Sequence, residues 1–93
     1  MTDHEHAHVT GVYLLHFDRP LAHAQHYLGW SSDVPKRVYA HAKGNGARLP
    51  AAFRAKGIGF VVARVWEGGD RTLERRLKQR KGARALCPVC RGE

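Results

Sequence analysis

Two short tripeptides, Gly11-Val12-Tyr13 and Tyr27-Leu28-Gly29, place two tyrosines fourteen residues apart in apolar segments whose composition is typical of β-strands. Side chains alternate between the two faces of a strand, so a hairpin can bring Tyr13 and Tyr27 onto the same side of a sheet. Two phenol groups there could position a water molecule and a phosphate oxygen. The plainer alternative for either tyrosine alone is packing on a core. Gly29 favours a site slightly, since a strand glycine often permits the close approach of another group.

Three further candidates lie in segments that we expect to be helical. Arg37 and His41 are four residues apart, so one helix face presents both. A guanidinium group binds phosphate through its planar fork, and an imidazole can accept or pass a proton. Glu74 is a single carboxylate within a basic segment and could bind Mg²⁺ or Mn²⁺, because such a cation needs few protein ligands. The alternatives are a surface arginine beside a surface histidine, and an ion pair between Glu74 and Lys78.

The elements that would position these residues follow the order β-β-α-α-β-α. The sequence predicts strands at 12–17, 26–30 and 58–66, and helices at 35–42, 50–56 and 70–81. We expect Ser31, Ser32 or Asp33 to cap the first helix, Asp70 to cap the third, and a loop to begin at Asp18-Arg19-Pro20. The fold class is therefore α+β, with a small three-stranded, mainly antiparallel sheet flanked by helices.

We divide the chain into three parts. Residues 1–9 are a His-rich tail that contains His4, His6 and His8 and that we expect to be flexible. Residues 10–82 form the folded domain, and residues 83–93 form a C-terminal tail without a clear element. Cys87 and Cys90 in this tail have the spacing of half a zinc site. A full structural zinc site would need two more ligands, from the His-rich tail or a second copy, and spacing supplies none; two exposed, reduced cysteines are the simpler interpretation.

The charge of the chain is strongly asymmetric. The net charge is +8 overall, with −3 on residues 1–34 and +11 on residues 35–93. A surplus of this size favours a polyanionic partner over a merely solvated basic face, so we expect DNA, with RNA not excluded. The candidate phosphate contacts are Lys36, Lys43, Arg48, Arg71, Arg75, Lys78 and Arg84. The sequence contains no apolar stretch of the roughly 20 residues that span a membrane, and its polar start does not have the order of a secretory signal, so we expect a cytoplasmic protein.

The two tripeptides, Arg37, His41 and Glu74 occur in the order and at the spacing of the GIY-YIG nuclease family, and residues 11–80 resemble its small stand-alone bacterial members. Residues 43–48 also resemble the family's loop after the first helix. The resemblance implies that Tyr13 and Tyr27 line the active site and that Arg37 stabilises the phosphoryl group. It also implies that His41 lies one helical turn from Arg37 and that Glu74 binds the metal. In that mechanism Tyr13, helped by His41, takes a proton from the attacking water.

The function that the resemblance implies is a metal-dependent endonuclease that hydrolyses phosphodiester bonds of DNA with little sequence specificity. The main alternative is a non-catalytic nucleic-acid-binding module on the same scaffold. A further alternative is a subunit whose target is chosen by a partner protein or a second copy.

Overall fold

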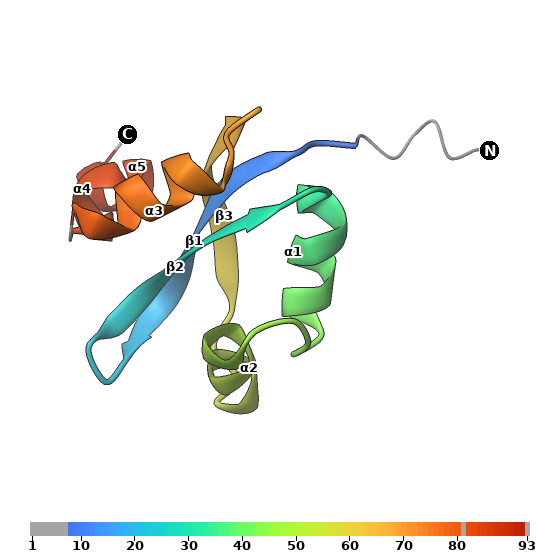
Figure 1. The fold of residues 1–93 in the computed structure, drawn as a ribbon. Helices are drawn as coiled ribbons and strands as arrows, with labels where there is room; N and C mark the ends of the chain where they lie inside the picture. The colour runs from blue at the N-terminus through green and yellow to red at the C-terminus, as the bar shows by residue number, and fades with distance from the viewer. Residues whose placement is uncertain (1–7, 81, 93) are drawn as a thin grey trace.

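A three-stranded antiparallel sheet forms the centre of the fold in the computed structural model, which describes residues 8–80 and 82–92 (Figure 1). Its strands are β1 (Gly11–Leu21), β2 (Ala24–Ser31) and β3 (Phe60–Glu67), in the order β2-β1-β3. The central strand β1 is fully buried from residue 12 to residue 15, on both faces. This agrees with its unbroken apolar sequence, which predicts a strand covered on both sides.

The β1–β2 hairpin is tighter than the sequence predicts. Asp18-Arg19-Pro20 does not begin a loop, because β1 continues to Leu21, which pairs with Ala24. The amide of Asp18 donates a hydrogen bond to the carbonyl of Gly59 (2.9 Å), so this polar segment remains tied to the chain entering β3. The predicted long connection therefore shrinks to two residues, of which Ala22 has a positive φ of 56°.

One face of the sheet is covered by α1 (Val34–Ala42) and α2 (Arg48–Ala55). Asp33 caps α1 by accepting a hydrogen bond from the amide of Lys36 (3.3 Å), in agreement with the predicted cap. The core on this face contains Tyr13, Leu15, Phe17, Val34, Phe53 and Ile58. The rings of Phe17 and Phe53 stack with their centroids 3.7 Å apart, which fixes α2 against β1.

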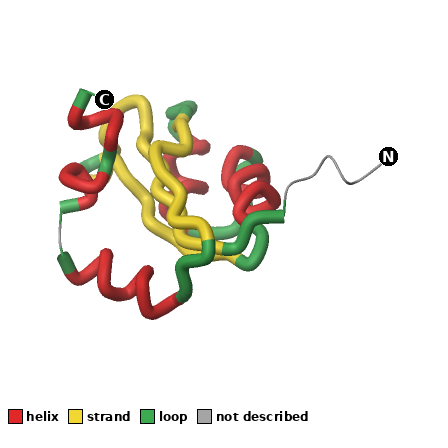
Figure 2. The backbone as a smooth tube through the Cα atoms, turned by 90° about the horizontal axis from the view of Figure 1, so that it is seen from above, coloured by secondary structure: helices red, strands yellow, loops and turns green. Residues whose placement is uncertain are grey.

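The opposite face is covered by α3 (Arg71–Gln79), α4 (Ala83–Leu86) and α5 (Pro88–Arg91). Figure 2 shows the strands between the helices of the two faces. Asp70 caps α3 as predicted, accepting from the amide of Leu73 (2.8 Å). The core on this face contains Val12, Leu14, Leu28, Leu77 and Cys87.

The C-terminal segment differs from the sequence prediction. It forms the short helices α4 and α5 in place of a segment without structure. Cys87 is fully buried, so the expectation of two exposed cysteines is wrong. The reason is that Cys87, between the two helices, packs in the core cluster formed by β1, β2 and α3. Burial of Cys87 against the sheet therefore stabilises this segment, and no local pattern in residues 82–93 predicts that burial.

The N-terminal region is described only from His8 onward, so the expectation about His4 and His6 lies outside the described residues. The carbonyl of Val9 accepts a hydrogen bond from the amide of Val34 (2.7 Å), and Nδ1 of the exposed His8 lies 3.7 Å from Oδ2 of Asp33. Within residues 8–80 and 82–92, none of the helices has the length and apolar character needed to cross a bilayer.

Candidate active site

A buried hydrogen bond between Tyr13 and His41 lies at the centre of the candidate site. The Tyr13 hydroxyl donates to Nε2 of His41 at 2.7 Å, and the two side chains are 0% and 1% exposed. On the other side of the ring, Nδ1 of His41 donates to the carbonyl of Asn45 at 3.2 Å. A carbonyl can only accept, so the Asn45 contact places the ring proton on Nδ1 and leaves Nε2 as the acceptor for Tyr13.

Tyr27 joins this pair from β2. In the β1–β2 register Tyr13 lies opposite Gly29 and Tyr27 lies opposite Leu15, so the two tyrosines share one side of the sheet, as the sequence predicts. This is the side that α1 covers. The Tyr27 ring centroid is 6.2 Å from that of Tyr13 and 5.4 Å from that of His41. Tyr27 is half-buried while Tyr13 is not exposed at all, so Tyr27 is the phenol of this pair that solvent can reach.

Gly29 is required by the packing of the two tyrosines. A Cβ atom at this position would lie 2.6 Å from the Tyr13 hydroxyl oxygen and 2.9 Å from Cε2 of Tyr27. Both distances are too short for ordinary contact, so a larger residue would displace the rings. Gly29 thus has a physical reason to follow the tyrosine of the second tripeptide: its missing side chain provides the space for Tyr13.

The electrostatic surroundings keep both members of the pair uncharged. Burial raises the pKa of Tyr13 well above its usual range, and the charges of Tyr27 and Glu74 raise it further, against the opposing effect of Arg37. Burial also lowers the pKa of His41, against the Asn45 hydrogen bond, with a further lowering from the charge of Arg37. Neutral imidazole therefore predominates at pH 7. The high pKa of Tyr13 opposes its expected role as the group that takes a proton from water.

Arg37, whose side chain is exposed, lies one helical turn before the buried His41 on α1. The loop after α1 passes close to both side chains, because a Cβ on Gly46 would be 3.1 Å from His41 Nδ1 and 3.6 Å from Arg37 Cδ. Gly46 has a φ of +103°, a conformation that glycine adopts at little cost. The sequence indicated this loop by its likeness to a family pattern, but it did not predict that the carbonyl of Asn45 would orient the histidine.

Glu74 approaches the site from α3, on the other layer of the molecule. Its side chain is 16% exposed, and Oε2 lies 3.1 Å from Nζ of Lys78, the ion pair that the sequence offered as the plainer alternative. Such a pair on a helix surface contributes only a few tenths of a kcal/mol. The Glu74 charge also raises the pKa of Tyr13, although burial and Tyr27 raise it more.

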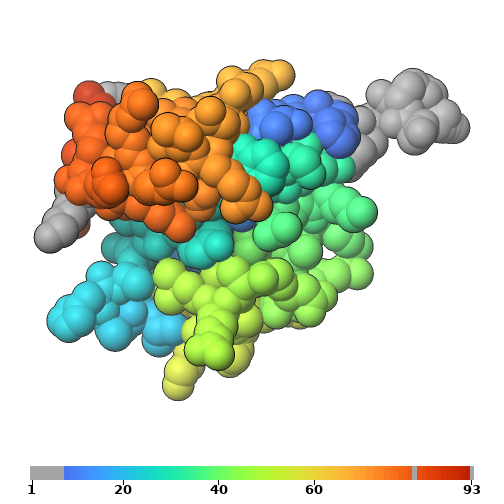
Figure 3. All heavy atoms as spheres, in the orientation of Figure 1, coloured from blue at the N-terminus to red at the C-terminus, as the bar shows by residue number. Residues whose placement is uncertain are grey.

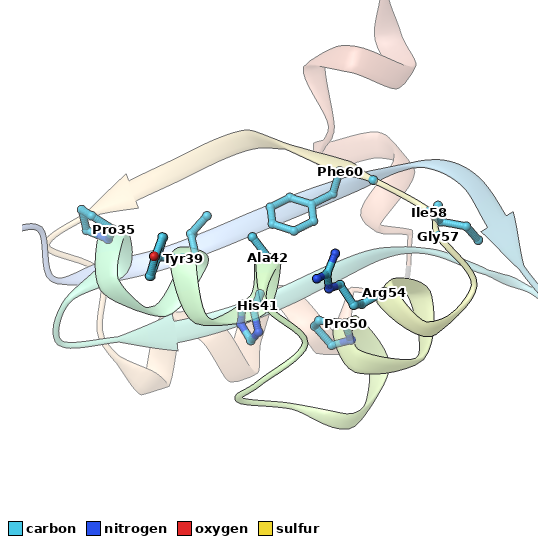
Figure 4. A pocket seen from close by; sticks show the side chains of 11 residues that line it. Pro35, Tyr39, His41, Ala42, Pro50, Arg54, Gly57, Ile58 and Phe60 are labelled. Atoms are coloured by element: carbon cyan, nitrogen blue, oxygen red, sulfur yellow. The ribbon is translucent and has the colours of Figure 1, made fainter.

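Two hollows border these residues. One, of about 310 Å³, lies between β2 and α3 and is lined by Tyr27 and Lys78. Figure 3 shows α3 in orange, β2 in blue-green and the segment after α1 in green on the same face of the molecule. A larger cleft of about 600 Å³ lies between α1, α2 and the start of β3 (Figure 4), where His41 and Arg54 line a mainly apolar wall. Of the candidate residues, Tyr27 lines the first hollow and His41 lines this cleft, whereas Arg37 and Glu74 line neither.

All seven predicted phosphate-contacting residues are exposed, but they belong to both helical layers: Lys36, Lys43 and Arg48 to one, and Arg71, Arg75, Lys78 and Arg84 to the other. Two of them also pack on aromatic rings. The Arg71 guanidinium lies 4.5 Å from the ring centroid of Trp30, and the Lys43 ammonium lies 4.7 Å from that of Tyr39.

A second group of ligand-type side chains lies on the opposite face of the sheet. His16, His26, Cys87 and Cys90 each offer one atom to a cluster in which all four atoms lie within 4.8 Å of one another. The spacing of residues in the sequence did not identify further ligands for the two cysteines. The two histidines lie in the β1–β2 hairpin, whereas the sequence analysis expected further ligands from the N-terminal tail or a second copy. The signal that could have found them is the hairpin register, which sets His16 opposite His26.

Comparisons of the chain with protein-family models, with curated proteins and with solved structures each found no match.

Proposed function

We propose that this chain is a divalent-metal-dependent endonuclease of the GIY-YIG type that hydrolyses phosphodiester bonds in DNA. The observation that carries the proposal is that four residues from β2, α1 and α3 act on one buried phenol, that of Tyr13 in β1. Tyr13 donates to His41 and packs beside Tyr27, and the charges of Arg37 and Glu74 both act on its pKa. The chain is also strongly basic beyond its first strands, with a net charge of +11 on residues 35–93.

Glu74 fits a hard divalent cation better than any softer metal. It offers carboxylate oxygens, its side chain is partly exposed, and its ion pair with Lys78 is weak enough to be displaced. When bound by Glu74, Mg²⁺ or Mn²⁺ would supply Lewis-acid stabilisation of negative charge on a phosphate. The sulfur and nitrogen atoms on the opposite face of the sheet are the wrong type for these ions.

The residues of the site would divide the remaining work by their access to solvent. Arg37 is exposed and presents a guanidinium fork that would bind and neutralise the phosphoryl oxygens. Tyr27 is the accessible phenol and would contact water and phosphate. Tyr13 is buried with a raised pKa, so we assign it to holding His41, in place of the proton-accepting role that the resemblance implied.

Weak sequence selectivity follows from the type of contact available. Lysine and arginine bound to phosphates position a protein on nucleic acid but carry no direct sequence information. The exposed cations lie on both helical layers, so binding would depend chiefly on counterion release. The main rival function, a binding module without catalysis, uses the same cations and differs in that no bond is broken.

A substrate panel separates these functions. Purified chain is incubated with supercoiled plasmid, branched DNA and RNA, with Mg²⁺, with Mn²⁺ or without added metal. The proposal expects cleavage of DNA only where metal is added. Binding without cleavage under every condition would support the binding module and overturn the proposal.

The tyrosines provide a matched control against a contaminating nuclease. Tyr27→Phe removes the accessible hydroxyl of the site, whereas Tyr39→Phe changes an exposed tyrosine on α1 that the proposal does not use. We expect Tyr27→Phe to cleave at least about tenfold more slowly, a loss of about 1.4 kcal/mol of transition-state stabilisation, and Tyr39→Phe to match the parent. Equal activity of all three proteins would mean that the activity does not arise from this site.

A further inference from the structure

We propose that His16, His26, Cys87 and Cys90 bind one structural zinc ion. His16 lies in β1, His26 lies in β2, Cys87 joins α4 to α5, and Cys90 lies in α5. The two cysteines are about seventy residues from the histidines in sequence, yet the four ligand atoms lie within 4.8 Å of one another. The cluster is on the face of the sheet that carries Val12 and Leu14, opposite to the Tyr13 side chain, so it is separate from the buried Tyr13–His41 pair.

Four of the six distances among these atoms are close to those of a tetrahedral zinc site. With zinc bonds of about 2.3 Å to sulfur and about 2.0 Å to nitrogen, a regular tetrahedron requires about 3.3 Å between two nitrogens and about 3.5 Å between nitrogen and sulfur. The structure has 3.2 Å between His16 Nδ1 and His26 Nε2. It has 3.4 Å and 3.6 Å from His16 Nδ1 to the sulfurs of Cys87 and Cys90, and 3.3 Å from Cys90 to His26 Nε2.

Hydrogen bonds alone do not account for this arrangement. Nδ1 of His16 has three polar neighbours, the two sulfurs and Nε2 of His26, all within 3.6 Å. A single ring nitrogen carries at most one proton and can donate well to one of them. A central cation bound by all four atoms satisfies every one of these contacts at once. Two thiolates would also balance the charge of Zn²⁺, and sulfur with imidazole nitrogen is the donor set typical of zinc.

The ion would have a structural role, because four protein ligands leave no open position for a substrate or water. The helices α4 and α5 contain four residues each, too few to be stable by themselves. Among the described residues, these helices contact the rest of the domain through the core cluster around Cys87 and through the four candidate zinc ligands. Zinc would join this C-terminal segment to the outer half of the β1–β2 hairpin, in a domain small enough to benefit from such a link.

The test measures bound metal in the untagged chain by mass spectrometry and then titrates the metal-free chain with Co²⁺. We expect about one zinc per chain, and a Co²⁺ spectrum with intense tetrahedral visible bands and a thiolate-to-cobalt charge-transfer band. His26→Asn and Cys90→Ser should each weaken zinc binding at least about tenfold, and Cys90→His, which keeps a ligand, should restore most of it. Removal of zinc should lower Tm by about 10 °C or more.

Two control variants exclude binding elsewhere. His23→Asn changes an exposed histidine in the hairpin turn, and a triple alanine variant removes His4, His6 and His8; both should keep zinc. Should Cys90→Ser fail to fold, the Co²⁺ spectrum of the parent still decides. Absence of a thiolate-to-cobalt band, a Cys87–Cys90 disulfide in the purified chain, or zinc that is lost with the three N-terminal histidines would overturn the proposal. Nuclease activity is not a readout, so this result is independent of the proposed function.

Discussion

Replacing Gly29 by alanine tests whether the Tyr13–His41 pair is held as the structure describes. The added Cβ would lie 2.6 Å from the Tyr13 oxygen and 2.7 Å from Cζ of the same ring. Ordinary contact begins near 3.4 Å, so the ring must move by about 0.8 Å, the difference between 3.4 and 2.6 Å. A shift of that size can stretch the 2.7 Å hydrogen bond to His41 beyond useful length.

The expected loss follows from that displacement. Overpacking a core typically costs about 1–3 kcal/mol, and a loss of about 2 kcal/mol in a domain of this size lowers Tm by about 8–16 °C. The matched control is Gly59→Ala, whose Cβ would meet the carboxylate of the exposed Asp18 at 2.9 Å, the movable end of a flexible side chain. We expect that variant to change Tm by less than half as much.

Two measurements give the result. Thermal unfolding followed by circular dichroism compares the two alanine variants with the parent. Imidazole nitrogen NMR shifts then report whether Nδ1 of His41 keeps its proton and Nε2 keeps its hydrogen bond. If Gly29→Ala has the same Tm as Gly59→Ala and the same His41 nitrogen chemical shifts as the parent, the close packing of Tyr13 on Gly29 is wrong.

Four further predictions follow. Arg37→Lys keeps the charge but loses the guanidinium fork, so kcat should fall at least about tenfold while Kd for DNA changes less than about threefold; equal losses would make Arg37 an ordinary phosphate contact. Burial lowers the pKa of His41 in the folded state, so its contribution to stability is complete above the unfolded pKa of about 6.5. Stability should decline as the pH falls from there through the lower folded pKa. Tm is measured against pH for the parent and for His41→Gln, and equal slopes of Tm against pH in the two proteins would contradict this prediction. Arg75→Gln should flatten the slope of log Kd against log salt by about one on two unrelated duplexes, whereas a salt-insensitive preference for one duplex would reveal direct base readout. Asp70→Ala removes the α3 cap and should cost about 1 kcal/mol in denaturant unfolding, and no loss would mean that water replaces the cap.

Local patterns predicted much of the fold because the decisive interactions are local or periodic. Alternation along two short strands placed Tyr13 and Tyr27 on one face, and the side chains of Asp33 and Asp70 predicted where helices begin. The sequence-based prediction failed where a contact with a residue distant in the sequence determines the local structure. Asp18 looked like a loop residue, but its amide pairs with the chain before β3.

The same limit applies to the sites. The spacing of Arg37 and His41 predicted a shared helix face, but burial of Tyr13 depends on the whole layer of α1 and α2 and could not be predicted from its tripeptide. The histidine tautomer depends on a backbone carbonyl, that of Asn45, which carries no sequence signature. The two histidines that lie beside Cys87 and Cys90 can be identified only from the register of the β1–β2 hairpin.

The proposed activity depends most directly on Glu74, and a comparison of two glutamates tests it. Glu74→Gln removes the charge at the proposed metal-binding position, and Glu67→Gln removes the same charge from an exposed glutamate at the end of β3. Single-turnover cleavage of plasmid is measured for both variants and the parent across a Mg²⁺ titration, with DNA affinity measured in parallel. We expect Glu67→Gln to match the parent and Glu74→Gln to lose about a hundredfold in rate, or about 3 kcal/mol, without loss of DNA binding. Cleavage by Glu74→Gln at the rate of the parent, with the same dependence on Mg²⁺, would contradict the proposed active site.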